Sequence, residues 1–144
     1  MKIREAKITD AKEIWEINNK SLGYDIDPET VREKLETVLG REFYKVFVCV
    51  DENDKAVGYI QLQDYETTYF ESCLNVLGLA VLSEYQGRGV GKILLERAED
   101  YARQKNFARV RVNSGAERTE AHKFYEHLGY SCHKMQKNFY KDLT

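Results

Sequence analysis

The stretch Ser83–Ala102, SEYQGRGVGKILLERAEDYA, places three glycines and two cationic side chains directly before a helical pattern. It follows Cys73–Leu82, CLNVLGLAVL, which is nearly continuous in apolar residues, as a strand buried on both faces would be. A strand, a glycine-rich turn and a helix together direct backbone N–H groups and the positive end of a helix dipole to one point. Because such a point binds phosphate groups without a special side chain, the sequence predicts a site for a phosphorylated cofactor.

Two common phosphate-binding motifs do not fit the spacing of these glycines. A Walker A loop has GxxxxGK followed by Ser or Thr, but Ile93 stands where the hydroxyl side chain should be. A dinucleotide-binding fingerprint has GxGxxG, whereas Gly87, Gly89 and Gly91 form GxGxG. A nucleotide hydrolase and a dinucleotide-dependent enzyme are therefore disfavoured.

The composition limits the classes of protein that the chain can belong to. At 144 residues, with 42% hydrophobic and 32% charged residues, it predicts one globular domain over residues 1–144. A net charge of −2 gives no basic field for nucleic acid, and no apolar run is long enough for a membrane span or a signal peptide. Three cysteines without a CxxC pair favour reduced thiols. We therefore expect a cytoplasmic protein with no nucleic-acid or membrane partner.

The pattern along the chain predicts an α/β (α+β) fold in one domain. Strands are predicted at Lys2–Ile8, Tyr44–Val50, Ala56–Tyr65, Cys73–Leu82, Ala108–Asn113 and, as one or two strands, within Tyr130–Leu143; helices are predicted after Asp10, after Asp27, after the glycine turn and over Glu117–Gly129. We expect a mixed, mostly antiparallel sheet of about six to seven strands flanked by about four helices, with a parallel pair across the helix that follows the glycines.

The spacing that does fit the turn is QxxGxG, formed by Gln86, Gly89 and Gly91. With the apolar strand before it and the later helix Ala121–Tyr130, AHKFYEHLGY, the sequence resembles the GNAT superfamily of acyl-CoA-dependent N-acetyltransferases over essentially the full chain. The resemblance implies transfer of acetyl from acetyl-CoA, as co-substrate, to a primary amine of a small molecule or peptide, by direct attack in a ternary complex. It also implies splayed central strands, with the pantetheine arm of CoA in the gap between them.

The resemblance implies a set of cofactor-binding residues on the strand, the turn and a later strand end. The set is Leu79, Ala80, Val81, Gln86, Arg88, Gly89, Val90, Gly91, Lys92 and Asn113. In this set the backbone amides from Arg88 to Lys92 receive the pyrophosphate, and a backbone N–H near Leu79 and Ala80 polarises the thioester carbonyl. Asn113 either hydrogen-bonds the pantetheine arm or is an ordinary residue at the end of a strand.

Tyr125 matches the position at which many relatives hold a tyrosine near the thioester sulfur, so it is the candidate general acid for the departing thiolate. The alternative is that it is a core aromatic of an amphipathic helix. A base must also deprotonate the amine, and Glu71 is the first candidate by position, beside Asp64 and Glu66, each of which is otherwise a solvated charge at a strand end. His122 and the other histidines lack metal-ligand spacing, so we expect no metal.

Two stretches are candidates for holding the acceptor amine. They are Asn18–Asp27, NNKSLGYDID, and Asp64–Ser72, DYETTYFES, whose tyrosines and acids suit a cationic amine unless they are simply polar loops. A non-catalytic acyl-CoA-binding regulatory module is the alternative function. The tyrosine-bearing tail offers an edge for strand pairing, which leaves a homodimer open. The identity of the amine and the length of the acyl chain are not readable from the sequence.

Overall fold

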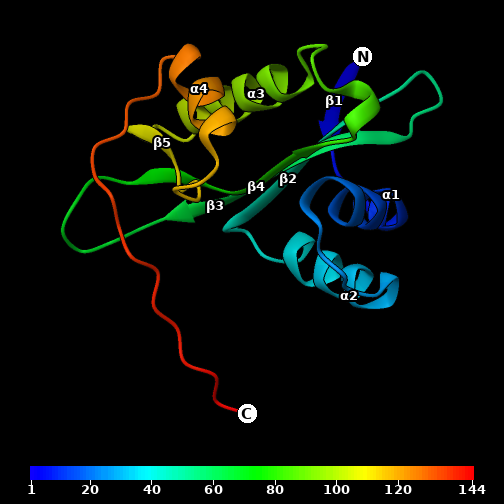
Figure 1. Cartoon of the computed structure of the whole chain (residues 1–144), viewed down its shortest axis with the longest axis horizontal. Helices are drawn as coiled ribbons and strands as arrows, with labels where there is room; N and C mark the ends of the chain where they lie inside the picture. Colours follow the sequence, from blue (N-terminus) through cyan, green and yellow to red (C-terminus); the bar gives the residue numbers. More distant parts are fainter. The chain divides into compact units, whose positions relative to one another are not determined.

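The computed structural model describes residues 1–144, with four α-helices and five strands (Figure 1). In chain order they are β1 Lys2–Glu5, α1 Ala11–Ile17, α2 Pro28–Leu39, β2 Tyr44–Val50, β3 Ala56–Tyr65, β4 Cys73–Val81, α3 Val90–Gln104, β5 Arg109–Val112 and α4 Thr119–His127. The chain divides into two compact units, Met1–Val112 with the whole sheet and Asn113–Thr144 with α4 and the tail. One domain over residues 1–144 stays a prediction.

The five strands form one sheet in the order β1-β2-β3-β4-β5. The first three pairings are antiparallel, and β4 and β5 are parallel because α3 crosses over between them. This confirms the predicted α/β class and the parallel pair. The predicted strands Tyr44–Val50 and Ala56–Tyr65 are also confirmed, since β2 and β3 have these bounds and pair as an antiparallel hairpin.

The prediction of six to seven strands is wrong, because no strand forms after α4. Helix α4 ends at His127, two residues before Gly129, whose φ of 93° directs the chain out of the helix. The residues that follow form neither helix nor strand, and the large apolar side chains Met135, Phe139, Tyr140 and Leu143 are all exposed. In a strand Met135, Phe139 and Leu143 would lie on one face, but Lys137 and Lys141 would stand between them on that face, so the tail offers no continuous apolar surface to a sheet.

The two faces of the sheet explain why β2 is apolar at nearly every position. Val46, Val48 and Val50 are buried in one core cluster with residues of α1 and α2. Phe47 points to the other face, where its ring contacts that of Tyr101 on α3 with 5.8 Å between centroids. Helices α1 and α2 thus cover one face and α3 the other (Figure 1).

Helix α3 packs tightly on the sheet at Gly58 of β3. A Cβ atom at this position would lie 3.0 Å from Val90 Cγ1, 3.2 Å from the Ala80 carbonyl oxygen and 3.3 Å from Leu94 Cδ1. Only glycine permits this approach without a shift of the helix. The close packing brings the first turn of α3 next to the C-terminal end of β4.

Helix α1 is held to the sheet by a partly buried ion pair. Both oxygens of Asp10, the residue before the helix, accept from the Arg4 guanidinium of β1 at 2.8 and 2.9 Å, and one of them also accepts from the Lys7 N–H at 2.7 Å. The Asp10 side chain is only 5% exposed. These contacts raise the pKa of Arg4 above its ordinary value, so the guanidinium stays charged.

Candidate active site

The turn between β4 and α3 has the backbone conformation that the glycine spacing predicted. Gly87 and Gly89 have φ angles of 78° and 82°, in the left-handed region that other residues rarely adopt. Gly89 is the N-cap of α3, and its carbonyl accepts the helical bond from the Ile93 N–H at 3.1 Å. The N–H groups before Ile93, on Val90, Gly91 and Lys92, belong to the first turn, where a helix has no internal acceptor for them.

The side chain of Gln86 connects the turn to the end of strand β4. Its Nε2 donates to the carbonyl oxygen of Val81, the last residue of β4, at 3.1 Å. The same oxygen accepts from Ser21 Oγ, in the π-turn η2 (Asn18–Leu22) that follows α1, at 2.8 Å. Gln86 therefore holds the turn to the end of β4, and its part in binding the cofactor stays a prediction.

The cations of the turn lie on its solvent side. Arg88 and Lys92 are both exposed, and the Arg88 guanidinium lies over the ring of Tyr85, 5.1 Å from its centroid. Neither cation forms an ion pair within the chain. Their charges are therefore free to add to the positive end of α3.

Strand β4 separates from β5 halfway along its length. The parallel pairing ends at Val76 and Val112, while the pairing with β3 continues to Val81. Between these two parts Leu77 is the extra residue of a β-bulge, because Gln61 pairs with Gly78 and Leu62 with Val76. Leu79, Ala80 and Val81 thus pair with a strand on one side only, which confirms the splayed strands that the resemblance implied.

Two predicted site residues, Asn113 and Tyr125, belong to the second unit. Asn113 follows the last residue of β5, and Tyr125 lies on α4, where its ring contacts those of Phe124 and Tyr130 with centroids 5.3 and 6.0 Å away. Burial raises the pKa of the Tyr125 phenol above its ordinary value, against a smaller opposite effect of Arg118. The phenol is therefore fully protonated at neutral pH, as a general acid must be.

The structure does not bring Glu71 together with Ala80. Glu71 lies before the first residue of β4 and its carboxylate is 3.8 Å from Arg109 of β5. From Cys73 to Ala80 the strand rises by about 23 Å at roughly 3.3 Å per residue. The other two candidates have partners as well, since Asp64 accepts from Lys105 at 2.6 Å and Glu66 from Ser72 at 2.9 Å. The geometry gives no support to any of the three as a base at the thioester.

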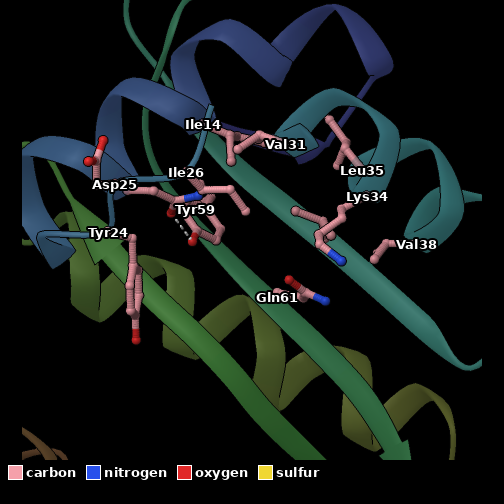
Figure 2. A pocket seen from close by; sticks show the side chains of 12 residues that line it. Ile14, Tyr24, Asp25, Ile26, Val31, Lys34, Leu35, Val38, Tyr59 and Gln61 are labelled. Atoms are coloured by element: carbon pink, nitrogen blue, oxygen red, sulfur yellow. Dashed lines mark hydrogen bonds between the residues drawn. The ribbon is translucent and has the colours of Figure 1, made fainter. Parts of the chain in front are cut away.

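A cavity of about 490 Å³ in the first unit lies between α1, α2 and the β2–β3 side of the sheet (Figure 2). Its apolar wall comes from both helices, their link and β2, through Ile14, Ile26, Val31, Leu35, Val38 and Val46. Its polar residues include Asn18, Tyr24 and Asp25 from the predicted stretch Asn18–Asp27, and none from Asp64–Ser72. Of the two candidate stretches, only the first lines this cavity.

Strand β3 connects this cavity to β4. Tyr59 and Gln61 line the cavity, and they pair with Ala80 and Gly78 across the sheet. The Tyr59 hydroxyl donates to Asn18 Oδ1, and burial raises the pKa of Tyr59 to about 12. Neither Tyr59 nor Gln61 was singled out from the sequence, because polar residues also stand at Gln63 and Asp64 of the same strand.

The cysteines and histidines contribute no obvious chemistry. Cys49 and Cys73 are buried, and burial raises the pKa of both thiols. The His122 ring N–H donates to the Gly115 carbonyl at 2.8 Å. No three His, Cys, Asp or Glu side chains are grouped as metal ligands. The absence of a metal stays a prediction.

Comparison with known proteins identifies the family. Residues 11–130 match the model of the acetyltransferase (GNAT) family. The chain therefore belongs to the GNAT family, and it is an acyltransferase, as the turn and the splayed strands indicated.

Several known proteins are similar over most of their length. The uncharacterized N-acetyltransferase YhdJ of Bacillus subtilis (strain 168) is 28% identical over 74% of this chain and 75% of its own. The N-alpha-acetyltransferase of Sulfurisphaera tokodaii is 26% identical over 98% of this chain and 86% of its own. The structure of AAC(6')-Iy with the bisubstrate analog CoA-S-monomethyl-acetylneamine has a TM-score of 0.84 at 17% identity and covers 98% of this chain and 97% of that one. At that identity the likeness shows the fold.

None of the helices has both the length and the apolar character that crossing a lipid bilayer requires.

Proposed function

We propose that this acyltransferase moves the acetyl group of acetyl-CoA to a primary amine of a small molecule or peptide, in a ternary complex. The observation that carries the proposal is the separation of β4 from β5 beyond Val76, beside the N-terminus of α3. The free side of Leu79–Val81 suits an extended pantetheine arm, and the first turn of α3 suits a pyrophosphate. Tyr59 and Gln61 of β3 line the cavity and pair with this part of β4, so the cavity lies beside it.

In the proposed reaction the amine nitrogen lone pair attacks the thioester carbonyl carbon, and a backbone N–H on the side of β4 that faces away from β3, at Leu79, stabilises the oxyanion. The carbon–sulfur bond then breaks, the CoA thiolate takes a proton from Tyr125, and the amide nitrogen loses its extra proton. Supporting a direct attack, the two buried thiols have raised pKa values and so remain poor nucleophiles.

Deprotonation of the amine proceeds through water in this proposal. The only carboxylate that lines the cavity is Asp25, which is exposed. Without a dedicated base, kcat/KM for an acceptor rises with pH up to the pKa of its own ammonium group, because only the free amine has a lone pair. A plateau at a pH far below the acceptor pKa would reveal a base in the protein.

The test is an assay of free-thiol release from acetyl-CoA in the presence of single amines, with calorimetry of CoA binding on the same sample. The panel contains monoamines, polyamines, aminoglycosides, amino acids and short peptides, and acetyl-CoA alone measures hydrolysis. Acceptor-dependent thiol release, with the acetylated amine found by mass spectrometry, supports the proposal. CoA binding without turnover on any class would favour a regulatory acyl-CoA-binding module.

A further inference from the structure

The cavity between α1 and α2 has too little negative charge for a polycation. Of the residues that line it, only Asp25 and Lys34 are charged, so their formal charges cancel. Six of the others are aliphatic and form a continuous apolar wall. A second or third ammonium group placed against this wall would lose part of its hydration without gaining a partner, which is unfavourable.

Lys34 is an unpaired cation at this cavity. Two positions away on the same helix, Arg32 lies near Glu29 and Glu36, at 3.8 and 3.9 Å. Lys34 forms no ion pair or hydrogen bond with the chain, although it lies among the lining residues. Figure 2 shows its ammonium group pointing toward Gln61 on β3, and shows Asp25 at the other end of the cavity. One end of the cavity thus offers an ammonium and a carboxamide to a ligand.

The distance between the two ends follows from the strand. Tyr59 and Gln61 lie two positions apart on the same face of β3, which corresponds to about 7 Å. The proposed thioester position, near Leu79 and Ala80, pairs with Ile60 and Tyr59, so the reacting amine belongs at the Tyr59 end. A group that reaches Lys34 and Gln61 then lies about 7 Å from that amine. An α-amino acid is too short for this span, since its amine and carboxylate are separated by one carbon.

We infer that the acceptor is a monoamine with an apolar body whose far end carries a carboxylate, and that Lys34 selects for this carboxylate. The inference rests on the proposed acetyl transfer and assigns its substrate class. The apolar body fills the aliphatic wall, the carboxylate pairs with Lys34 beside the Gln61 amide, and the same lysine repels a second cation.

Three amines of one shape provide the test: 4-(aminomethyl)benzoate, 4-methylbenzylamine and p-xylylenediamine. They differ only in the group at the far end, which is an anion, a methyl or a second cation. For the wild type, kcat/KM should fall in that order, by about fivefold at each step, because one charge contact at a partly exposed site contributes about 1 kcal/mol. Spermidine and kanamycin should be poorer acceptors than all three.

The variant Lys34→Glu should reverse this order, with p-xylylenediamine becoming the best of the three. Lys12→Glu is the matched control, because Lys12 is also exposed, lies on the neighbouring α1 and does not line the cavity. It makes the same change in net charge and should keep the wild-type order. Both variants should fold, as circular dichroism would show. An order that Lys34→Glu leaves unchanged, or a preference of the wild type for spermidine or kanamycin, overturns the inference while acetyl transfer stands.

Binding without turnover gives an independent result. Trp15 is the single tryptophan of the chain, and its Nε1 donates at 2.7 Å to the carbonyl oxygen of Ile26, which lines the cavity. Its fluorescence, excited at a wavelength where the ligands do not absorb, should change on binding of the three amines with the same order and the same reversal in Lys34→Glu. If no amine is acetylated, the proposed function fails. The fluorescence titrations then still decide the inference, since equal affinities of wild type and Lys34→Glu for 4-(aminomethyl)benzoate contradict it.

Discussion

The two halves of the proposed active site are built in different ways. On the cofactor side, the turn Gln86–Lys92 offers backbone N–H groups, and its glycines are there for their φ angles. On the acceptor side, the cavity is formed by side chains of α1, η2, α2, β2 and β3. Backbone recognition depends on a short local pattern, whereas the cavity depends on residues up to 47 positions apart, from Ile14 to Gln61.

This difference separates what the family shares from what is particular to this chain. A turn made of main-chain groups tolerates many side chains, provided that the glycines remain. A cavity made of side chains changes its ligand with each substitution. We therefore expect substitutions on the cofactor side to abolish binding of CoA with every acceptor, and substitutions on the acceptor side to change which amine reacts.

The largest effect is expected for Gly89→Val. The left-handed φ of 82° is strained for a β-branched residue by about 1 to 2 kcal/mol, and a turn that distorts to relieve this strain loses two N–H bonds to the charged pyrophosphate, at about 2 kcal/mol each. The two lost bonds predict a CoA affinity about 1000-fold lower, measured by calorimetry.

Gly23→Val is the matched control for Gly89→Val. Gly23 also has a left-handed φ, of 71°, and as at Gly89 an added Cβ would meet no neighbouring atom within 4 Å. The control should lose a similar amount of stability and keep its CoA affinity. Equal loss of affinity in both variants would mean that backbone strain acts globally, and the account of the turn would be wrong.

The cofactor side could be predicted from the sequence and the acceptor side could not, because one depends on local pattern and the other on residues far apart in the chain. The turn, β4 and α3 were predicted because glycine spacing, an apolar run and a helical period are local signals. The tail strands were wrongly predicted because local strand propensity in Tyr130–Leu143 is not matched by an apolar face that a sheet could bury. Lys34 and Gln61 were missed because nothing in one-dimensional spacing indicates that helix α2 faces β3 across a cavity.

The next effect is expected for Tyr125→Phe, which tests whether the chemistry belongs to the second unit. Loss of a general acid should lower kcat by about 100-fold and leave CoA affinity unchanged. The phenol is active when protonated, so the wild-type rate falls as pH rises through its pKa, and burial places this limb above pH 10. The variant should lack the limb.

Tyr140→Phe is the control for Tyr125→Phe, because Tyr140 is 86% exposed in the tail. Its kcat and its alkaline limb should equal those of the wild type. An unchanged kcat in Tyr125→Phe would remove this residue from the mechanism and leave thiolate protonation to solvent.

A smaller effect is expected for Asp10→Asn, which loosens α1 on the acceptor side. The variant loses the paired bonds from Arg4 and leaves a partly buried cation, so the free energy of unfolding should fall by about 2 kcal/mol in urea titrations. The control Asp100→Asn removes an exposed ion pair with Arg103, and it should change the free energy of unfolding by less than about 0.5 kcal/mol. Well below the unfolding transition, CoA affinity should be the same in all three proteins. A loss of CoA affinity in Asp10→Asn alone would show that the two halves are not independent.

The smallest effects are expected where the two halves meet, at the Val81 carbonyl. Ser21 donates to this oxygen from the acceptor side and Gln86 from the cofactor side. Ser21→Ala and Gln86→Ala each remove one neutral bond, at about 1 kcal/mol, or about fivefold in kcat/KM. We expect Ser21→Ala to act mainly on the KM of the amine and Gln86→Ala mainly on the affinity for CoA.

The double variant Ser21→Ala with Gln86→Ala decides whether Val81 connects the halves. While either donor remains, the carbonyl keeps one partner, so the second removal should cost more than the first and the effects should exceed their sum by about 1 kcal/mol. Strict additivity would mean that each donor supports only its own element. Substitutions in the cavity would then leave CoA binding at the turn unchanged, because nothing at the end of β4 would transmit a change in the cavity to the turn.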